Sequence, residues 1–441
     1  MKSSHNQLVL ASLLFVTAEL QAADLLQVFH EAQLNDPVFA AARATLQAGQ
    51  ERLVQGRSAL LPSVTLSANT TANSQEVKYL GGPFSIYSGS YNYNSNGYNV
   101  MLVQPLFRQQ NWMAYSEAEI QVAQSEAQFK IAEQDLILRV AQAYFDVLIA
   151  QDSVQLVEAQ KKAIAEQLEQ AKRNFEVGSA TITDTLEAQA RHDLTDAQEI
   201  AARNDLEIKR NALQQLINEA PQDIKPLGKG FVMEAPQPPD MEKWVEVSQS
   251  ANLQIAIAQA GATIAEKEVA RVRGGHYPTI DLVANYSTNN VSGGTMPSET
   301  TNKSVGVQLN IPLFQGGAVN SKWREAEANR ERANQELENA RRSVAQLTRQ
   351  SYLGVVSGIA QVNALQQALA SSESVLQASK LGHEVGVRTN LDVLNAQQQL
   401  FATRRDLYQA QYNYLVSQLR LQAAIGSLDE DDLSKVNRAL Y

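Results

Sequence analysis

The sequence predicts an α+β membrane protein in which a small β-sheet continues into very long paired α-helices. Three observations carry this prediction. The chain repeats its own pattern after about 210 residues. Proline is absent from two long tracts, which leaves them free to be helical. Short segments elsewhere alternate apolar and polar residues, as strands do, and no run of 18 or more apolar residues offers a membrane-spanning helix.

The internal repeat organises the whole chain. FEVGSATITDTLEAQ at Phe175–Gln189 returns as HEVGVRTNLDVLNAQ at His383–Gln397, 208 residues later. Upstream, LLPSVTLSAN at Leu60–Asn69 returns as HYPTIDLVAN at His276–Asn285. This period is far longer than a solenoid unit of roughly 20–50 residues. We therefore predict a duplicated half-protein, each half having a strand hairpin, a very long helix, a glycine-containing turn and a second helix.

The prolines locate the long helices. All 12 lie between Pro37 and Pro312, and none lies in 108–220 or after Pro312. Proline inside a helix costs about 3 kcal/mol, so both tracts can be helical throughout. Valines at seven-residue spacing from Val140 to Val154 predict coiled-coil packing. At 1.5 Å per residue the longer helices reach roughly 100 Å. The predicted helices span about 109–177, 183–218, 318–385 and 390–425.

A Val-Gly pair marks the turn of each predicted helical hairpin. Gly178 and Gly386 occupy equivalent positions, and glycine adopts the left-handed conformation at a helix C-terminus at little cost. Oxygen-bearing side chains follow each glycine and are expected to cap the returning helix. The candidate caps are Thr183 or Asp184 in the first half and Asn390 or Asp392 in the second.

Composition excludes several classes of protein. The first 22 residues combine Lys2, an apolar run at 8–16 and small residues at Ala22 and Ala23, which is typical of a secretory signal peptide rather than a buried N-terminal helix. The chain has no cysteine, so it has no disulfide, no zinc–thiolate site, no catalytic thiol and no lipidated cysteine. A net charge of −10 disfavours nucleic acid as a partner.

The alternating segments have two readings. Val305, Val307, Leu309 and Ile311 are separated by polar residues, and similar patterns occur at 64–68, 98–102 and 280–286. Period two predicts one apolar and one polar face, as in a half-buried soluble sheet or a strand of an outer-membrane barrel. The signal peptide and the lack of another core around the strands favour the barrel. Interfacial aromatic residues are then expected at Tyr91, Tyr93, Tyr98 and Tyr286.

The number of strands requires several copies. One chain supplies four predicted strands, too few to close a barrel, and open edges in lipid leave backbone groups unsatisfied at several kcal/mol each. Three copies give 12 strands, so a trimeric 12-stranded β-barrel, continuous with a long α-helical barrel of antiparallel coiled-coil hairpins, is the economical fold prediction.

The order of elements divides the chain into five segments. Each repeat is predicted to contain a helix, a β-hairpin (about 62–105 or 278–312) and a helical hairpin (about 109–217 or 318–425). The segments between and after the repeats are expected to form an equatorial belt. The boundaries are 1–22 for the signal peptide, 23–217 for the first repeat, 218–255 for the inter-repeat segment, 256–426 for the second repeat and 427–441 for the C-terminal segment.

Taken together, the duplicated plan and the two Val-Gly tip motifs resemble the TolC family of outer-membrane exit ducts over nearly the whole mature chain. The resemblance implies a homotrimer with its barrel in outer-membrane lipid and its helices crossing the periplasm. It also implies an entrance closed by inner coiled coils. This entrance opens when a periplasmic adaptor (membrane fusion) protein docks together with an inner-membrane transporter of the ABC or proton-driven type.

The resemblance also assigns a periplasmic gate latch. Thr183 and Asp184 match the tip of the outer hairpin, and Arg388 matches the arginine that ties the inner hairpin to it. A guanidinium and a carboxylate form a charge-assisted bond, which is weak enough when exposed to open. His383 stands where the family often has a latch tyrosine. This departure is expected to weaken the link and to make closure sensitive to pH.

Two further features of the entrance follow from the resemblance. Asp392 matches an inward acidic residue that forms a ring of three in a trimer, whereas the second acidic position of the family is Asn395 here, which implies a weaker cation ring. The outer faces beside Gly178 and Gly386 are the expected docking sites of the adaptor.

The implied function is a passive export duct for type I protein secretion or for small toxic compounds. The absence of a lipidated cysteine favours secretion over a multidrug efflux duct of a proton-driven pump. An enzyme is not supported, because the sequence has no glycine-rich phosphate loop, HExxH pair or GxSxG elbow, and no cofactor is expected. A structural coiled-coil envelope protein would explain the helices but not the alternating strands.

Overall fold

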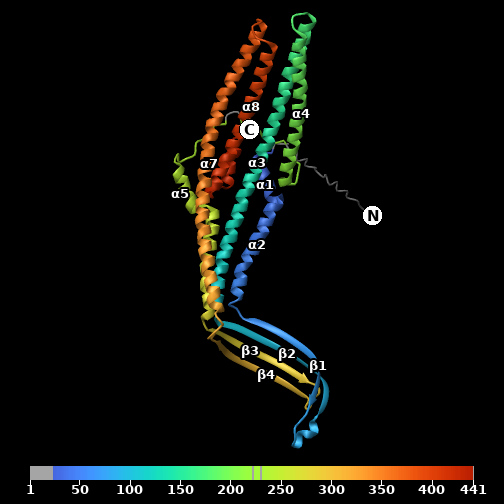
Figure 1. The fold of residues 1–441 in the computed structure, drawn as a ribbon, viewed down its shortest axis with the longest axis vertical. Coiled ribbons are helices and arrows are strands. Elements are labelled where there is room, and N and C mark those ends of the chain that lie inside the picture. Colours follow the sequence, from blue (N-terminus) through green and yellow to red (C-terminus); the bar gives the residue numbers. More distant parts are fainter. Residues whose placement is uncertain (1–22, 221–222, 229–230, 441) are drawn as a thin grey trace, which may run out of the picture.

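The computed structural model describes residues 23–440 except 221–222 and 229–230, so the predicted signal peptide at 1–22 lies outside the described residues. The molecule is long and narrow (Figure 1). The tips of two long helical hairpins lie at one end of the molecule, and a four-stranded sheet extends from the other end. The shorter helices lie beside the long helices between these two ends. The predicted α+β class is thereby confirmed.

Each half begins with two helices and a strand hairpin, followed by two long helices. The first half contains α1 (Leu25–Asn35), α2 (Pro37–Ser58), β1 (Ser63–Val77), the 3₁₀ turn η1 (Pro83–Tyr87), β2 (Gly89–Phe107), α3 (Gln109–Glu176) and α4 (Ile182–Ile217). The second half contains α5 (Met241–Ala251), α6 (Leu253–Arg273), the 3₁₀ turn η2 (Gly274–His276), β3 (Thr279–Val291), β4 (Ser298–Asn310), α7 (Ala318–Glu384) and α8 (Asn390–Ile425), and α9 (Glu430–Asn437) follows.

The four long helices begin and end within one residue of their predicted limits. Only one helix was predicted before each strand hairpin, whereas the structure has two. Asp36 and Asn252 cause the interruptions, because both adopt extended backbone and use their side chains to cap the helix that follows. Asp36 is buried, and its carboxylate also accepts a 2.7 Å hydrogen bond from Arg139 of α3.

The sheet has one apolar face that the rest of the described chain leaves uncovered. Its order is β1-β2-β3-β4, with all neighbours antiparallel. The register places apolar residues in rows across all four strands, as the alternation predicted. Val64 and Val305, at the two ends of such a row, are 66% and 76% exposed. That row is Val64, Leu102, Ala284 and Val305.

The four tyrosines expected at the membrane interfaces are divided between the two faces of the sheet. Tyr98 and Tyr286 stack on the apolar face with their ring centroids 6.1 Å apart. Tyr93 has the opposite parity in β2, and its hydroxyl donates to Gln75 on the polar face. Tyr91 pairs with Gln75 on the same polar side. Because parity along a strand decides the face, only Tyr98 and Tyr286 lie on the apolar face, to which an interfacial girdle belongs.

The main hydrophobic core lies where the helices overlap at mid-length. Val140 and Val147 are buried there, as the seven-residue spacing predicted, together with Tyr144. The Tyr144 hydroxyl donates to the carbonyl oxygens of Ala23 (3.2 Å) and Lys225 (3.0 Å), which ties the inter-repeat segment to α3. Among the helices of the described residues, none has a stretch long and apolar enough to cross a membrane.

Candidate functional site

The tips of the two helical hairpins lie at the same end of the molecule and have the same turn (Figure 1). Gly178 (φ +77°) and Gly386 (φ +79°) adopt the left-handed conformation predicted for them. In each turn one carbonyl accepts from two successive N–H groups that follow the glycine. The shorter of these bonds, 2.8 Å in both turns, run from Ser179 to Asn174 and from Val387 to Gly382.

The N-cap residues of the returning helices are Thr181 and Thr389, and of the predicted acceptors Asp184 and Asp392 take part in capping, whereas Thr183 and Asn390 do not. Each threonine Oγ1 accepts from the N–H three residues later, at 3.3 and 3.2 Å, and the aspartate there accepts from the threonine N–H at 2.9 and 2.8 Å. Asp184 and Asp392 therefore complete capping boxes from the third helical position. Thr183 and Asn390 do not serve as caps, because both already lie in the first turn of their helices, after the N-cap residues Thr181 and Thr389.

Arg388 lies against its own hairpin. Its Nη1 is 3.7 Å from Oδ1 of Asp392, one helical turn on. The arginine stem crosses Gly382, where an added methyl group would come within 2.6 Å of Arg388 Cγ. Hydrogen bonds from the N–H and hydroxyl of Thr389, and then the charge of Arg388, lower the pKa of Asp392. Asp392 is thus held as an anion at the tip.

Within one chain the other predicted latch residues stay apart from Arg388. Among the described residues, no hydrogen bond or ion pair joins Arg388 to Thr183 or Asp184, and its ion pair is with Asp392. His383 is half-buried in the last turn of α7, where its carbonyl accepts from the N–H of Gly386 at 3.0 Å.

A contact that sequence reasoning missed joins the two hairpins near their tips. Arg191 of α4 donates from Nη1 to Gln398 Oε1 (2.6 Å) and from Nη2 to Asn395 Oδ1 (3.0 Å), both on α8. The internal repeat marks Arg191 as unusual, because the equivalent position 208 residues later carries the neutral Gln399. The neutral Asn395, which departs from the acidic pattern of the family, is one of the two acceptors.

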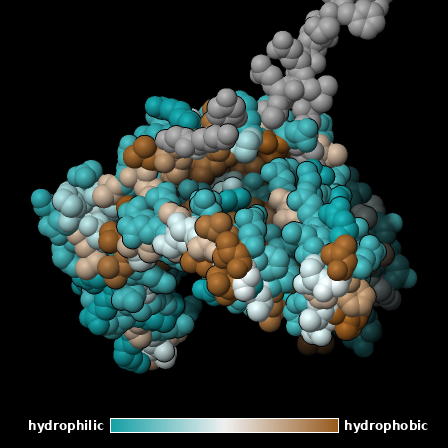
Figure 2. Space-filling model, turned by 90° about the horizontal axis from the view of Figure 1, so that it is seen from above, coloured by the Kyte–Doolittle hydropathy of each residue, from teal (hydrophilic) through white to brown (hydrophobic). Residues whose placement is uncertain are grey.

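The tips also expose apolar side chains. Val177, Val385 and Val387 are 77%, 66% and 77% exposed. Seen along the long axis from the tip end, hydrophobic patches are interspersed with a mostly hydrophilic surface (Figure 2).

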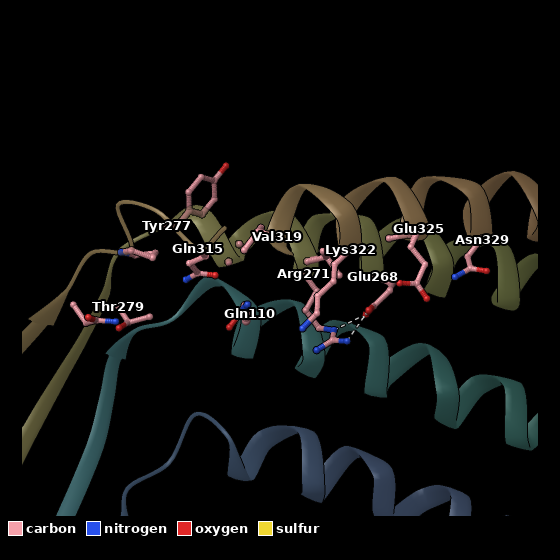
Figure 3. A pocket seen from close by; sticks show the side chains of 16 residues that line it. Gln110, Glu268, Arg271, Tyr277, Thr279, Gln315, Val319, Lys322, Glu325 and Asn329 are labelled. Carbon is pink, nitrogen blue, oxygen red and sulfur yellow. Dashed lines mark hydrogen bonds and ion pairs between the residues drawn. The ribbon is translucent and has the colours of Figure 1, made fainter. Parts of the chain in front are cut away.

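A second polar cluster lies where the sheet meets the helices (Figure 3). A cavity of about 550 Å³ is lined there by Glu268 and Arg271 of α6, which pair through Arg271 Nη2 and Glu268 Oε1 at 2.6 Å. Glu117 of α3 is 9% exposed, its Oε1 has no hydrogen-bond partner among the described residues, and the Arg271 Nε is 3.5 Å away. Burial, followed by the charge of Glu268, raises the pKa of Glu117 to about 7.

This cluster predicts that stability falls as the pH rises from 5 to 8. Glu117 holds its proton more tightly in the folded chain than in the unfolded chain, so the folded state loses stability once it must ionise. Glu117→Gln is expected to raise the free energy of unfolding by about 2–3 kcal/mol at pH 8 and by much less at pH 5. Denaturant melts of the detergent-solubilised protein at both pH values measure the difference.

The matched control is Glu266→Gln, which removes an exposed carboxylate from the same helix as Glu268. The control is expected to leave the pH profile as in the wild type. An unchanged profile for Glu117→Gln as well would contradict this account of the cluster.

The family model, the related sequences and the solved structures that resemble this chain are of outer membrane proteins. The family model described as "Outer membrane efflux protein" matches residues 28–219 and 244–427. The chain is 33% identical to the outer membrane protein TolC of Escherichia coli (strain K12), over 95% of this chain and 85% of that protein. It is 33% identical to the alkaline protease secretion protein AprF of Pseudomonas aeruginosa, over 97% of this chain and 89% of that protein.

Solved structures share the fold. The outer membrane protein VceC of Vibrio cholerae superposes with a TM-score of 0.76 over 91% of this chain and 96% of that chain, at 20% sequence identity. The Neisseria gonorrhoeae MtrE outer membrane channel in its open state gives a TM-score of 0.74 over 92% of this chain and 90% of that chain, also at 20% identity. At this level of identity the likeness concerns the fold alone.

Proposed function

The chain belongs to the outer membrane efflux protein family, and we propose that it is the outer-membrane channel of a tripartite export system. It conducts cargo passively from a periplasmic adaptor and an inner-membrane ABC or proton-driven transporter to the exterior. The observation that carries the proposal is the combination of an uncovered apolar sheet face at one end with paired coiled-coil tips at the other. Such a chain needs lipid around its sheet and protein partners at its tips.

The functional form is a homotrimer. Three four-stranded sheets close a 12-stranded barrel in outer-membrane lipid, and the helical hairpins form a tube in the periplasm. The tube supplies no energy of its own, so the purified protein is expected to hydrolyse no nucleotide. The adaptor docks at the outer faces of the tips beside Gly178 and Gly386, where Val177 and Val385 are exposed.

The cargo is a protein of the type I secretion class rather than a small toxic compound. Support comes from the relatives, which include secretion proteins named for alkaline protease and for proteases, at 33% and 30% identity over at least 94% of this chain. The chain also lacks the cysteine that lipidated efflux channels carry. Efflux of small compounds by a proton-driven pump is the alternative.

The entrance is closed by weak polar contacts at the tips. In the trimer, Arg388 reaches Thr183 and Asp184 at the tip of the neighbouring copy's α3–α4 hairpin; among the described residues of its own chain it pairs with Asp392 instead. His383, in the last turn of α7, adds a further polar link at the same tip. Asp392 contributes one carboxylate to a ring of three that prefers cations.

The gate is tested by Arg388→Ser in planar bilayers. The wild-type channel is expected to give a small, cation-preferring current. The variant is expected to conduct severalfold more, because one charge-assisted contact per copy is lost. Single-channel conductance of the purified protein measures the effect.

Arg342→Ser is the matched control, since it removes an exposed arginine that pairs with Glu338 along the shaft of α7. It is expected to leave the conductance unchanged. A large wild-type current that Arg388→Ser does not alter would discard the latch but keep the channel. No current from either well-folded sample would overturn the channel itself.

A further inference from the structure

The loop between β1 and β2 carries an exposed apolar cluster at the end of the sheet farthest from the helices (Figure 1). This loop covers 78–88 and contains the turn η1, whereas the loop between β3 and β4 covers only 292–297. In the longer loop, Leu80, Phe84 and Ile86 are 98%, 60% and 79% exposed. Several large apolar side chains that gather on one surface loop indicate a contact outside the single chain.

The β1–β2 loop has a defined backbone. Its base is closed by Ser88, whose hydroxyl oxygen accepts from the N–H of Tyr79 at 2.8 Å. Gly81 and Gly82 turn the chain with φ at +89° and +80°. Ser85 then donates from its N–H and from its hydroxyl to the carbonyl of Gly82, at 3.2 and 3.0 Å. These contacts fix the backbone from which the apolar side chains project.

The loop leans toward the polar face of the sheet. Tyr91 lies on that face opposite Gln75, and its hydroxyl donates to the carbonyl of Tyr87 in the loop at 2.7 Å. The shorter loop leans the same way, because Gly293 packs directly against Tyr93 of the polar face. In a barrel whose apolar face meets lipid, the polar face lines the lumen. Both loops therefore lean over the mouth of the lumen and away from the lipid.

The β1–β2 loop is long enough to reach the axis of the proposed barrel. Twelve strands spaced about 4.8 Å apart and tilted by about 40° close a barrel with a backbone radius of roughly 12 Å. The chain from Val77 to Pro83 spans up to about 20 Å when extended. No charged residue occurs from Tyr79 to Phe107, so three copies of the loop approach one another without charge repulsion.

We propose that the β1–β2 loops of three copies meet over the barrel axis and form an apolar outer gate of the channel. The occupant of each exposed cluster is the same loop of another copy, so the inference rests on the proposed trimer. Leu80, Phe84 and Ile86 are removed from water when they contact their counterparts. A hydrophobic constriction of this kind closes a pore by excluding water. The duct is thus closed at its outer mouth while no cargo passes, independently of the contacts at the helical tips.

Single cysteines in the loop test whether the copies meet. The chain has no cysteine, so every link comes from the introduced residue. Leu80→Cys, Phe84→Cys and Ile86→Cys are each treated in isolated outer membranes with a short bismaleimide and analysed on denaturing gels. We expect covalent dimers from these variants, because two of the three thiols at the axis are joined. Ser90→Cys is the matched control, an exposed residue of β2 beside the loop whose copies lie roughly 20 Å apart across the barrel, so it is expected to stay monomeric.

Single-channel conductance tests whether the meeting loops restrict the pore. The double variant Phe84→Ser/Ile86→Ser is compared with the unaltered loop, both in the Arg388→Ser background, so that the contacts at the tips are weakened equally in the two channels. We expect the conductance to rise at least about twofold, because the constriction becomes polar and fills with water. Met296→Ser in the same background removes an apolar side chain, 72% exposed, from the shorter loop and is expected to leave the conductance unchanged.

The outcomes separate the outer gate from the assembly on which it rests. No dimer from any of the three loop cysteines, in a trimer that resists SDS without heating, would overturn the inference and leave outer-leaflet lipid as the occupant of the cluster. Dimers together with an unchanged conductance would keep the contact but overturn the gate. The absence of both an SDS-resistant trimer and any channel current would overturn the proposed function, and this inference with it.

Discussion

Tyr144→Ala is expected to lower the free energy of unfolding by about 3–5 kcal/mol, the usual cost of removing a large buried aromatic side chain. The ring of Tyr144 is completely buried and contacts Phe145 edge-on at a centroid distance of 5.8 Å. Its hydroxyl bonds the carbonyls of Ala23 and Lys225. The substitution therefore leaves a cavity in the main core and removes one donor from each carbonyl, although the Ala23 carbonyl still accepts from the N–H of Lys225.

The internal repeat supplies the control for this prediction. Tyr352 occupies the equivalent position in α7 but is only half-buried, so Tyr352→Ala is expected to cost clearly less. Tyr144→Phe keeps the ring and removes only the hydroxyl, at an expected cost of about 1–2 kcal/mol. Denaturant melts followed by circular dichroism measure all three variants. If Tyr144→Ala and Tyr352→Ala lowered the free energy of unfolding equally, burial of the side chain within one chain would not determine the cost of removing it.

Gly426→Ala is expected to destabilise the protein by about 2–4 kcal/mol. Gly426 ends α8 with φ at +84°, a conformation that costs an L-residue roughly 1–2 kcal/mol. A methyl group would also come within 2.6 Å of the Ala251 carbonyl oxygen and 2.9 Å of the Asn252 Cα, both of which are backbone atoms. The link between α5 and α6 would have to move away from the end of α8.

The contrasting control is Gly354→Ala in the interior of α7, where an added methyl group has open space within the chain. Alanine there is expected to stabilise the helix by about 0.5–1 kcal/mol. Thermal melts of both variants should therefore shift in opposite directions. If Gly426→Ala left the stability unchanged, the backbone between α5 and α6 would move away from the end of α8 without a measurable loss of free energy.

The hairpin tips show which features of a candidate site can be predicted from the sequence and which cannot. Gly178 and Gly386 were predicted from the repeat alone, because a left-handed turn needs glycine whatever surrounds it. The predicted capping residues were right for Asp184 and Asp392, which complete the capping boxes, but the N-caps Thr181 and Thr389 were missed, because several oxygen-bearing side chains follow each glycine. Only the backbone conformation shows which of them precedes the first helical turn.

Long-range contacts were beyond sequence reasoning for a different reason. Arg191 and Asn395 lie on helices separated by most of the second half of the chain, and nothing in their local sequence marks them as partners. The same holds for Glu117, whose environment comes from Glu268 and Arg271 on another helix. Their chemistry depends on how the helices pack, which no periodicity encodes.

The sequence by itself determined the duplicated plan, the limits of the four long helices and the apolar face of the sheet. These features follow from local rules, since proline excludes helix, glycine permits the turn and alternation sets the face of a strand. The tertiary structure alone decided which charges meet, which tyrosine is buried and which edges stay open. Those outcomes depend on distances between residues far apart in the chain, and only the packed structure fixes such distances.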